Sequence, residues 1–177
     1  MSGSGLRLLV VGASSGIGRA IAEAAVAGGD WVAVGARRRD QLEEIKGCHA
    51  CITANVRDPA DCDRLASEAA AQLGGLDALV YAPAFLPLAR LVDTEAATWH
   101  EVLETSVVGA ALVTRAALPW LVLSKGRAAY LSSDSVRRLS VSRPSPAGPP
   151  PVFRRSDSDQ LGEPLQPLDG LAGSTPR

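Results

Sequence analysis

Three closely spaced glycines give this sequence of 177 residues its clearest chemical signal. Gly12, Gly16 and Gly18 lie in LLVVGASSGIGRAIAEAA, between an apolar segment and a helical pattern. Gly12 permits a tight turn, Gly16 lets the backbone approach a pyrophosphate, and Gly18 lets the helix pack close to a sheet. The free N–H groups and the positive dipole end of such a helix bind anions, so this segment predicts a phosphate site.

The spacing of these glycines distinguishes between classes of nucleotide site. It is G-x-x-x-G-x-G, and no Gly-Lys-Ser/Thr follows, which excludes the nucleoside-triphosphatase loop. Ser14 and Ser15 add hydroxyl groups beside the second glycine, and Ile17 lies between the last two glycines. A glycine triplet alone also fits a turn that merely needs flexible backbone, so the surrounding elements decide between the two interpretations.

Apolar strand-like segments alternate with helical patterns along the first three quarters of the sequence. We predict strands at 6–11, 31–35, 48–54, 76–81 and 127–133, and helices at 17–27, 39–46, 59–73 and 95–123. Each strand except the last is followed by a helix, which predicts a Rossmann-type, doubly wound parallel α/β sheet covered on both faces. Pro119 should kink or end the last helix near residues 116–118.

Residues 6–135 resemble the short-chain dehydrogenase/reductase family. VVGASSGIGRA is similar to its nucleotide-binding signature, and ALVTRAALPWL followed by GRAAYLSS is similar to its fourth helix and fifth strand. The resemblance implies an NAD(P)-binding Rossmann-like domain at 1–136, truncated after the fifth strand. It also implies an oxidoreductase that transfers hydride between a nicotinamide dinucleotide and an alcohol or ketone.

In this family the end of the second strand selects the cofactor, with an acidic residue for NAD and basic residues for NADP. Here that stretch is Val-Gly-Ala-Arg-Arg-Arg, so no carboxylate is present, and Arg37 or Arg38 could bind a phosphate. We therefore expect NADP rather than NAD. The alternative is that these arginines are only the solvated start of a helix.

Two further cofactor segments depart from the family pattern. Asn55-Val56 replaces the usual Asp-Val, although the amide oxygen of Asn55 can still accept a hydrogen bond from an adenine amine. Tyr81-Ala82-Pro83-Ala84 replaces Asn-Asn-Ala-Gly, which removes the side-chain amides, while Ala82 can still line the cofactor with its backbone.

The catalytic residues that the resemblance implies are incomplete. Ser133 matches the serine that orients the carbonyl, and Ser106 falls where the family has the asparagine of its proton relay. The family's general acid is a tyrosine whose pKa is lowered by a lysine four residues later.

No Tyr-x-x-x-Lys occurs in this sequence. Its only tyrosines are Tyr81 and Tyr130, and its only lysines are Lys46 and Lys125. Tyr130 lies in the fifth predicted strand, before Ser133, so it is not a displaced version of the family's acid.

Residues 137–177 differ in composition from the rest of the chain. They hold eight of the 12 prolines, with six arginines and six serines, and almost no periodic apolar residues. We expect this tail to be disordered, because it cannot bury enough apolar area to offset its ordering entropy. A frameshift, premature termination or altered splicing would explain the abrupt change, and reading the gene in its other frames tests that hypothesis.

Three readings of function remain. The first is an NADP-dependent oxidoreductase that acts on an alcohol or ketone but is impaired by the missing acid. The second, which we favour for this polypeptide, is a non-catalytic dinucleotide-binding remnant or a regulatory partner of an intact relative, with an interface at the helix 95–123. The same helix could form a homo-oligomer. The third is a chain too incomplete to fold stably, because its fifth strand would be an exposed edge.

Composition limits the partners and the compartment. Net charge is −1, and no basic stretch is interleaved with aromatic residues, so nucleic acid is not expected. The first apolar segment is too short for a signal sequence or a membrane span, so we expect a cytoplasmic protein without membrane contact. Cys48, Cys51 and Cys62 should be free thiols. We expect no metal site, because an offset of three in a strand places Cys48 and Cys51 on opposite faces.

Overall fold

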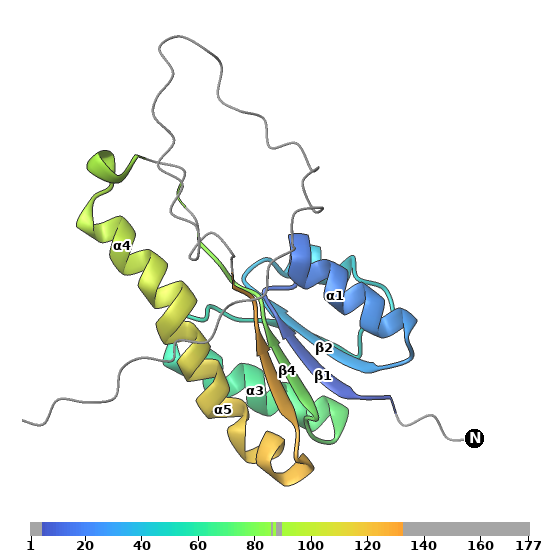
Figure 1. Cartoon of the computed structure of the whole chain (residues 1–177). Coiled ribbons are helices and arrows are strands. Elements are labelled where there is room, and N and C mark those ends of the chain that lie inside the picture. Colours follow the sequence, from blue (N-terminus) through green and yellow to red (C-terminus); the bar gives the residue numbers. More distant parts are fainter. Residues whose placement is uncertain (1–4, 86, 88–89, 133–177) are drawn as a thin grey trace, which may run out of the picture. The chain divides into compact units, whose positions relative to one another are not determined.

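The computed structural model describes residues 5–85, 87 and 90–132. Five strands form one sheet in the order β3-β2-β1-β4-β5, and every neighbouring pair is parallel. The predicted doubly wound α/β class is confirmed (Figure 1). The strands are β1 Arg7–Val11, β2 Trp31–Ala36, β3 Ala50–Thr53, β4 Ala78–Tyr81 and β5 Arg127–Tyr130. The helices are α1 Gly16–Ala27, α2 Arg39–Glu43, α3 Pro59–Leu73, the 3-10 turn η1 Leu91–Asp93, α4 Ala96–Leu103, the π-helical segment η2 Glu104–Val108 and α5 Gly109–Ser124.

The central strand β1 divides the core into two layers. Successive side chains of a strand point to opposite faces, so Leu8 and Val10 pack on one side and Leu9 and Val11 on the other. The first pair contacts the layer of α1 and α2, and the second pair contacts the layer of α3 and α5. Figure 1 shows α1 on one side of the sheet and α3 with α5 on the other.

Strand β5 lies at the edge of the described sheet. It pairs with β4 alone among the described residues, and all four of its side chains are exposed. The strand is shorter than the predicted segment 127–133, because it ends at Tyr130.

The segment predicted as one long helix consists of three consecutive pieces, α4, η2 and α5, which together form a composite helix. Pro119 does not end the last of them, because α5 continues to Ser124. Pro119 has no N–H, so the carbonyl of Arg115 loses its helical hydrogen bond. Both of these residues are exposed, while Ala117 and Leu121 are buried in the core. Water can therefore satisfy the freed carbonyl without disturbing the buried face.

Only one stripe of this composite helix is buried. Gly109, Val113, Ala117 and Leu121 follow at intervals of four residues and are buried. Within the stretch Ala96–Ser124 a window of 18 residues has a mean hydropathy of 1.7, so by length and composition alone this stretch is apolar enough to cross a membrane. The expectation of no membrane contact considered only the first apolar segment, so it stays a prediction.

The expected arrangement of Cys48 and Cys51 is wrong. Strand β3 begins at Ala50, so Cys48 lies in the loop before it, and strand alternation does not apply to the pair. Both side chains pack against the same core cluster, on the α1 and α2 side of the sheet. All three cysteines are free, and the described residues contain no group of three potential metal ligands.

Candidate cofactor site

The turn after β1 is tightly interlocked with its neighbours. Gly12 has a φ of +81°, and its N–H donates to the carbonyl of Gly35 at 2.7 Å. A Cβ at Gly12 would lie 2.7 Å from the backbone nitrogen of Pro83. A Cβ at Gly18 would collide with the carbonyl oxygen of Gly12. Both glycines are therefore required by close packing between α1, β1 and the loop after β4.

Gly16 faces open space instead. Its φ is +58°, and no heavy atom outside its chain neighbours and its own helix backbone lies within 4 Å of the place where a Cβ would be. The first turn of α1 has no acidic residue, and its N-cap residue Ser15 makes no side-chain capping bond. Ile17, the next residue, is 66% exposed. The N–H groups at this helix start therefore face neither an acidic side chain nor a capping hydroxyl, and a helix N-terminus of this kind can receive an anion.

Arg38 connects the end of β2 to this turn. Its Nη2 donates to the hydroxyls of Ser14 and Ser15, at 3.1 and 3.2 Å. Arg37 lines the same space, and both arginines are exposed. Positive charge and hydroxyl groups therefore lie together beside the anion-binding turn.

A pocket of about 240 Å³ opens at the carboxyl ends of β1 to β4. Its walls come from the turns that follow these four strands and from the helix α4 with η2. The chain runs outward from β1 to β3 and then returns to β4 on the other side, so the pocket lies where the strand order reverses. This is the position at which open α/β sheets bind their ligands.

Ion pairs join the loop after β3 to α4 and η2 at one wall of the pocket. Arg57, which follows β3, donates to Glu101 at 3.0 Å and to Glu104 at 2.8 Å. Asn55 is fixed by two more bonds: its Oδ1 accepts the N–H of Arg57 at 3.2 Å, and its own N–H donates to Asp61 at 2.8 Å. The bond from the Asn55 N–H helps to lower the pKa of Asp61. The loop after β3 is thereby joined to both α3 and α4.

Comparison with known proteins agrees with this geometry. Residues 12–144 match the protein family described as enoyl-(acyl carrier protein) reductase. A solved short-chain dehydrogenase from Streptomyces avermitilis aligns with a TM-score of 0.69 and 37% identity, over 75% of this chain and 51% of that chain. The chain belongs to the short-chain dehydrogenase/reductase family.

Several named relatives of this family share the same region. The 11-beta-hydroxysteroid dehydrogenase 1A of Arabidopsis thaliana is 34% identical over 72% of this chain and 39% of its own length. The cis-2,3-dihydrobiphenyl-2,3-diol dehydrogenase of a Pseudomonas strain is also 34% identical, over 72% of this chain and 49% of its own. An alcohol dehydrogenase from Thermococcus sibiricus, solved with 5-hydroxy-NADP, has a TM-score of 0.70 at 28% identity, over 75% of this chain and 60% of that chain. The chain thus spans about half the length of these short-chain dehydrogenases.

Most cofactor residues expected from the family pattern meet in the pocket. Those that line it are Gly12, Ser14, Ser15, Arg37, Arg38, Asn55, Val56 and Ala82. Gly16, Ile17 and Gly18 form the adjoining first turn of α1. Their individual roles in binding stay predictions.

The two residues expected in catalysis, Ser106 and Ser133, are not found in the described pocket lining, unlike most of the expected cofactor residues. Ser106 is exposed within η2 and is not among the residues that line the pocket, whereas its neighbour Thr105 lines it. The π-helical geometry of η2 changes which side chain faces inward, and the sequence pattern did not reveal it. Ser133 lies outside the described residues.

Nine described pocket residues were missed by sequence reasoning. They are Val11, Ala36, Ala54, Arg57, Pro83, Ala84, Phe85, Glu101 and Thr105. The first six lie within or beside segments that the family pattern had already marked, so their position along the chain was a usable signal. The other three are brought in by the loop after β4 and by the composite helix, and nothing in their spacing indicated a site.

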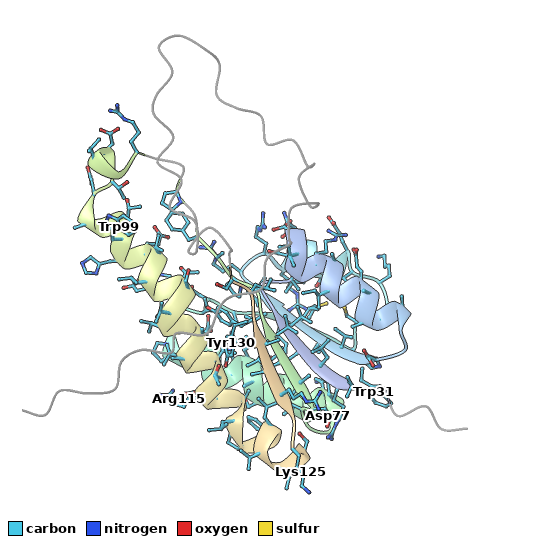
Figure 2. The ribbon with its side chains drawn as sticks, in the orientation of Figure 1. Trp31, Asp77, Trp99, Arg115, Lys125 and Tyr130 are labelled. Carbon is cyan, nitrogen blue, oxygen red and sulfur yellow. The ribbon has the colours of Figure 1, made fainter. Side chains whose placement is uncertain are left out.

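The two tyrosines of this chain both contact the composite helix. Tyr81 is buried, and its hydroxyl donates to the carbonyl of Thr105 at 2.5 Å. Tyr130 shares a hydrogen bond of 2.7 Å with the hydroxyl of Thr114, and it lies between β5 and α5 in Figure 2. Neither phenol is among the residues lining the described pocket.

Proposed function

We propose that this chain binds NADP(H) in the pocket at the carboxyl ends of β1 to β4. The observation that carries the proposal is the group of Arg37, Arg38, Ser14 and Ser15, with no carboxylate at the end of β2. A guanidinium fork and two hydroxyls form charge-assisted hydrogen bonds with a phosphate, and would favour the phosphorylated dinucleotide over NAD. The 5-hydroxy-NADP bound to the Thermococcus sibiricus alcohol dehydrogenase supports the choice.

The remaining pocket residues would hold the rest of the dinucleotide. The N–H groups at the start of α1 would bind the pyrophosphate, for which Gly16 leaves room. Asn55 and Val56 would line the adenine, and the backbone at Ala82 would line the far end of the pocket. When bound, the nicotinamide supplies or accepts a hydride.

The described tyrosines do not offer the proton that reduction of a carbonyl needs. Tyr81 already donates to Thr105, and burial raises the pKa of its phenol above the ordinary value. Tyr130 bonds to Thr114, away from the pocket lining. We therefore propose that the family's reaction, hydride transfer between NADP(H) and an alcohol or ketone, is impaired in this chain. The alternative role is a non-catalytic, dinucleotide-binding partner of an intact relative.

The composite helix suggests the kind of macromolecular partner. Trp99, Leu103 and Val107 lie at intervals of four residues, are all exposed, and continue toward Leu118 and Val122. Figure 2 shows Trp99 at the outer end of α4, away from the sheet. We propose that this face binds a second copy of the chain. We also propose that the protein is cytoplasmic and that neither nucleic acid nor a membrane is its partner.

Titration calorimetry of the full chain with NADPH and NADH tests the cofactor proposal. We expect NADPH to bind at least tenfold more tightly than NADH. Equal or tighter binding of NADH would overturn the preference, and no binding of either would overturn the function. A parallel assay with a panel of ketones at saturating NADPH tests the chemistry, because turnover at ordinary enzymatic rates would contradict the proposed impairment.

A further inference from the structure

Tyr81 makes a hydrogen bond that is central to the shape of the pocket wall. It is the last residue of β4 and is 3% exposed. Its hydroxyl donates at 2.5 Å to the backbone carbonyl of Thr105, which belongs to η2. A buried phenol thus reaches from the sheet to the backbone of the composite helix.

The carbonyl of Thr105 needs this donor because of the π-helical geometry. In an α-helix, the N–H of Gly109 would donate to Thr105, four residues earlier. In η2 the N–H of Gly109 donates instead to the carbonyl of Glu104. The carbonyl of Thr105 therefore loses the partner that an α-helix would provide, and the hydroxyl of Tyr81 supplies a donor to it.

The surroundings of Tyr81 leave little freedom at this point. A Cβ at Gly109 would lie 2.5 Å from the hydroxyl of Tyr81 and 3.0 Å from the carbonyl oxygen of Val56. The end of β4, the loop after β3 and the start of α5 therefore meet here without space for a side chain. Val56 and Thr105 both line the pocket, so this junction is also part of its wall.

The π-helical insertion sets the rotation of α4. One additional residue in a helical turn rotates the preceding segment by about 100° relative to the following one. With the insertion, Glu101 and Thr105 line the pocket and Ser106 is exposed. Without the insertion, Glu101 and Thr105 could not line the pocket while the stripe from Gly109 to Leu121 in α5 stays buried.

We propose that Tyr81 is a positioning residue of the cofactor pocket, whose hydroxyl stabilises η2 so that Thr105 faces the pocket. Its effect on ligand affinity rests on the proposed binding of NADP(H), whereas its effect on η2 does not. The two tyrosines provide a matched pair of variants. Tyr130 lies opposite Tyr81 in the β4–β5 register and also bonds to a threonine of the composite helix, but away from the pocket.

The experiment compares Tyr81→Phe with Tyr130→Phe in the full chain. Hydrogen exchange of the backbone amides in 101–109, measured without cofactor, should be about tenfold faster in Tyr81→Phe and unchanged in Tyr130→Phe. The dissociation constant for NADPH should rise about three- to tenfold in Tyr81→Phe alone. Val113→Ala, a core variant outside the pocket lining, should lower the thermal midpoint without changing this constant.

Each outcome decides a separate point. Unchanged exchange in 101–109 for Tyr81→Phe would overturn the proposal. Faster exchange with unchanged NADPH affinity would limit Tyr81 to a structural role and also overturn it. An equal loss of affinity in Val113→Ala would show a general effect of stability, and it would overturn the positioning role of Tyr81. If the unmodified chain bound neither nicotinamide cofactor, the proposed function would fail, while the exchange data would still determine whether Tyr81 stabilises η2.

Discussion

Gly12 and Gly16 both have positive φ angles, yet the structure requires each glycine for a different reason. At Gly12 a Cβ would approach the backbone of Pro83, whereas at Gly16 it would enter open space. The first glycine therefore serves the fold, and we propose that the second leaves room for the bound dinucleotide. Substitution by alanine separates these two purposes.

Gly12→Ala should destabilise the chain by about 2–4 kcal/mol, since strain at a left-handed residue adds to an overpacked contact. Gly16→Ala should cost only about 1 kcal/mol of stability, because strain acts there alone. It should still weaken NADPH binding at least tenfold, because the methyl group occupies the opening. Urea unfolding and titration calorimetry measure the two effects. Equal losses of stability in both variants would contradict the distinction.

Arg38 is the second residue whose contribution can be isolated. Arg38→Ala removes the guanidinium beside Ser14 and Ser15, so NADPH affinity should fall by about 10- to 100-fold while NADH affinity changes little. Arg39→Ala is the matched control, because Arg39 pairs with Glu43 on α2 and does not line the pocket. A similar loss for both nicotinamides in Arg38→Ala would indicate that Arg38 does not read the phosphate.

At the scale of elements, the alternation of strands and helices was predictable and the helix geometry was not. The apolar periods located all five strands and the helices α1, α2 and α3 to within three residues. The π-helical segment was not predictable, because it depends on a hydrogen bond from Tyr81 and on ion pairs with Arg57. These partners come from other parts of the chain, so no local pattern within 95–123 contains them.

The same reasoning explains how much of the site the sequence revealed. The glycine spacing and the arginines after β2 mark the side of the pocket that we propose for the phosphates, because those residues belong to one βαβ unit. Glu101 and Thr105 form the opposite wall, and their inward orientation follows from η2. Ser106 was therefore expected where Thr105 is found.

The start of β1 contains a charge pair that predicts a pH dependence. Asp77 accepts from the Nη2 of Arg7 at 2.6 Å and from the Nε and backbone N–H of Arg7 at 2.9 Å. These bonds lower the pKa of Asp77 from 3.8 to about 2. A carboxyl whose pKa is lowered on folding stabilises the fold above its unfolded value, and the contribution disappears as pH falls through the folded value.

We therefore expect the contribution of this pair to the free energy of unfolding to fall by up to about 2 kcal/mol between pH 5 and about pH 2. Urea unfolding at several pH values measures the loss. Asp77→Asn should be less stable at pH 5 and should show a smaller decline on acidification. A variant whose decline matches that of the unmodified chain would argue against the pair as the source.

At the scale of the whole molecule, the exposed face of α4, η2 and α5 predicts self-association. A contiguous exposed apolar face commonly marks an interface, and most homo-oligomers use a two-fold contact. Val107→Glu introduces a charge at a residue that is 58% exposed and outside the pocket lining. We expect light scattering to give a dimer for the unmodified chain and a monomer for the variant, with NADPH affinity retained. A monomer in both cases would refute the interface.

Strand β1 lies in the middle of the sheet, and this has a consequence for how the protein is made. It pairs on one side with β2, the next strand along the chain, and on the other side with β4, which is synthesised only after α3. On the ribosome, the half built on β1, β2 and β3 can form first, because its contacts are the more local. The contact of Gly12 with Gly35 would then precede its contact with Pro83, so the glycine-rich turn is completed only when the second half of the sheet arrives.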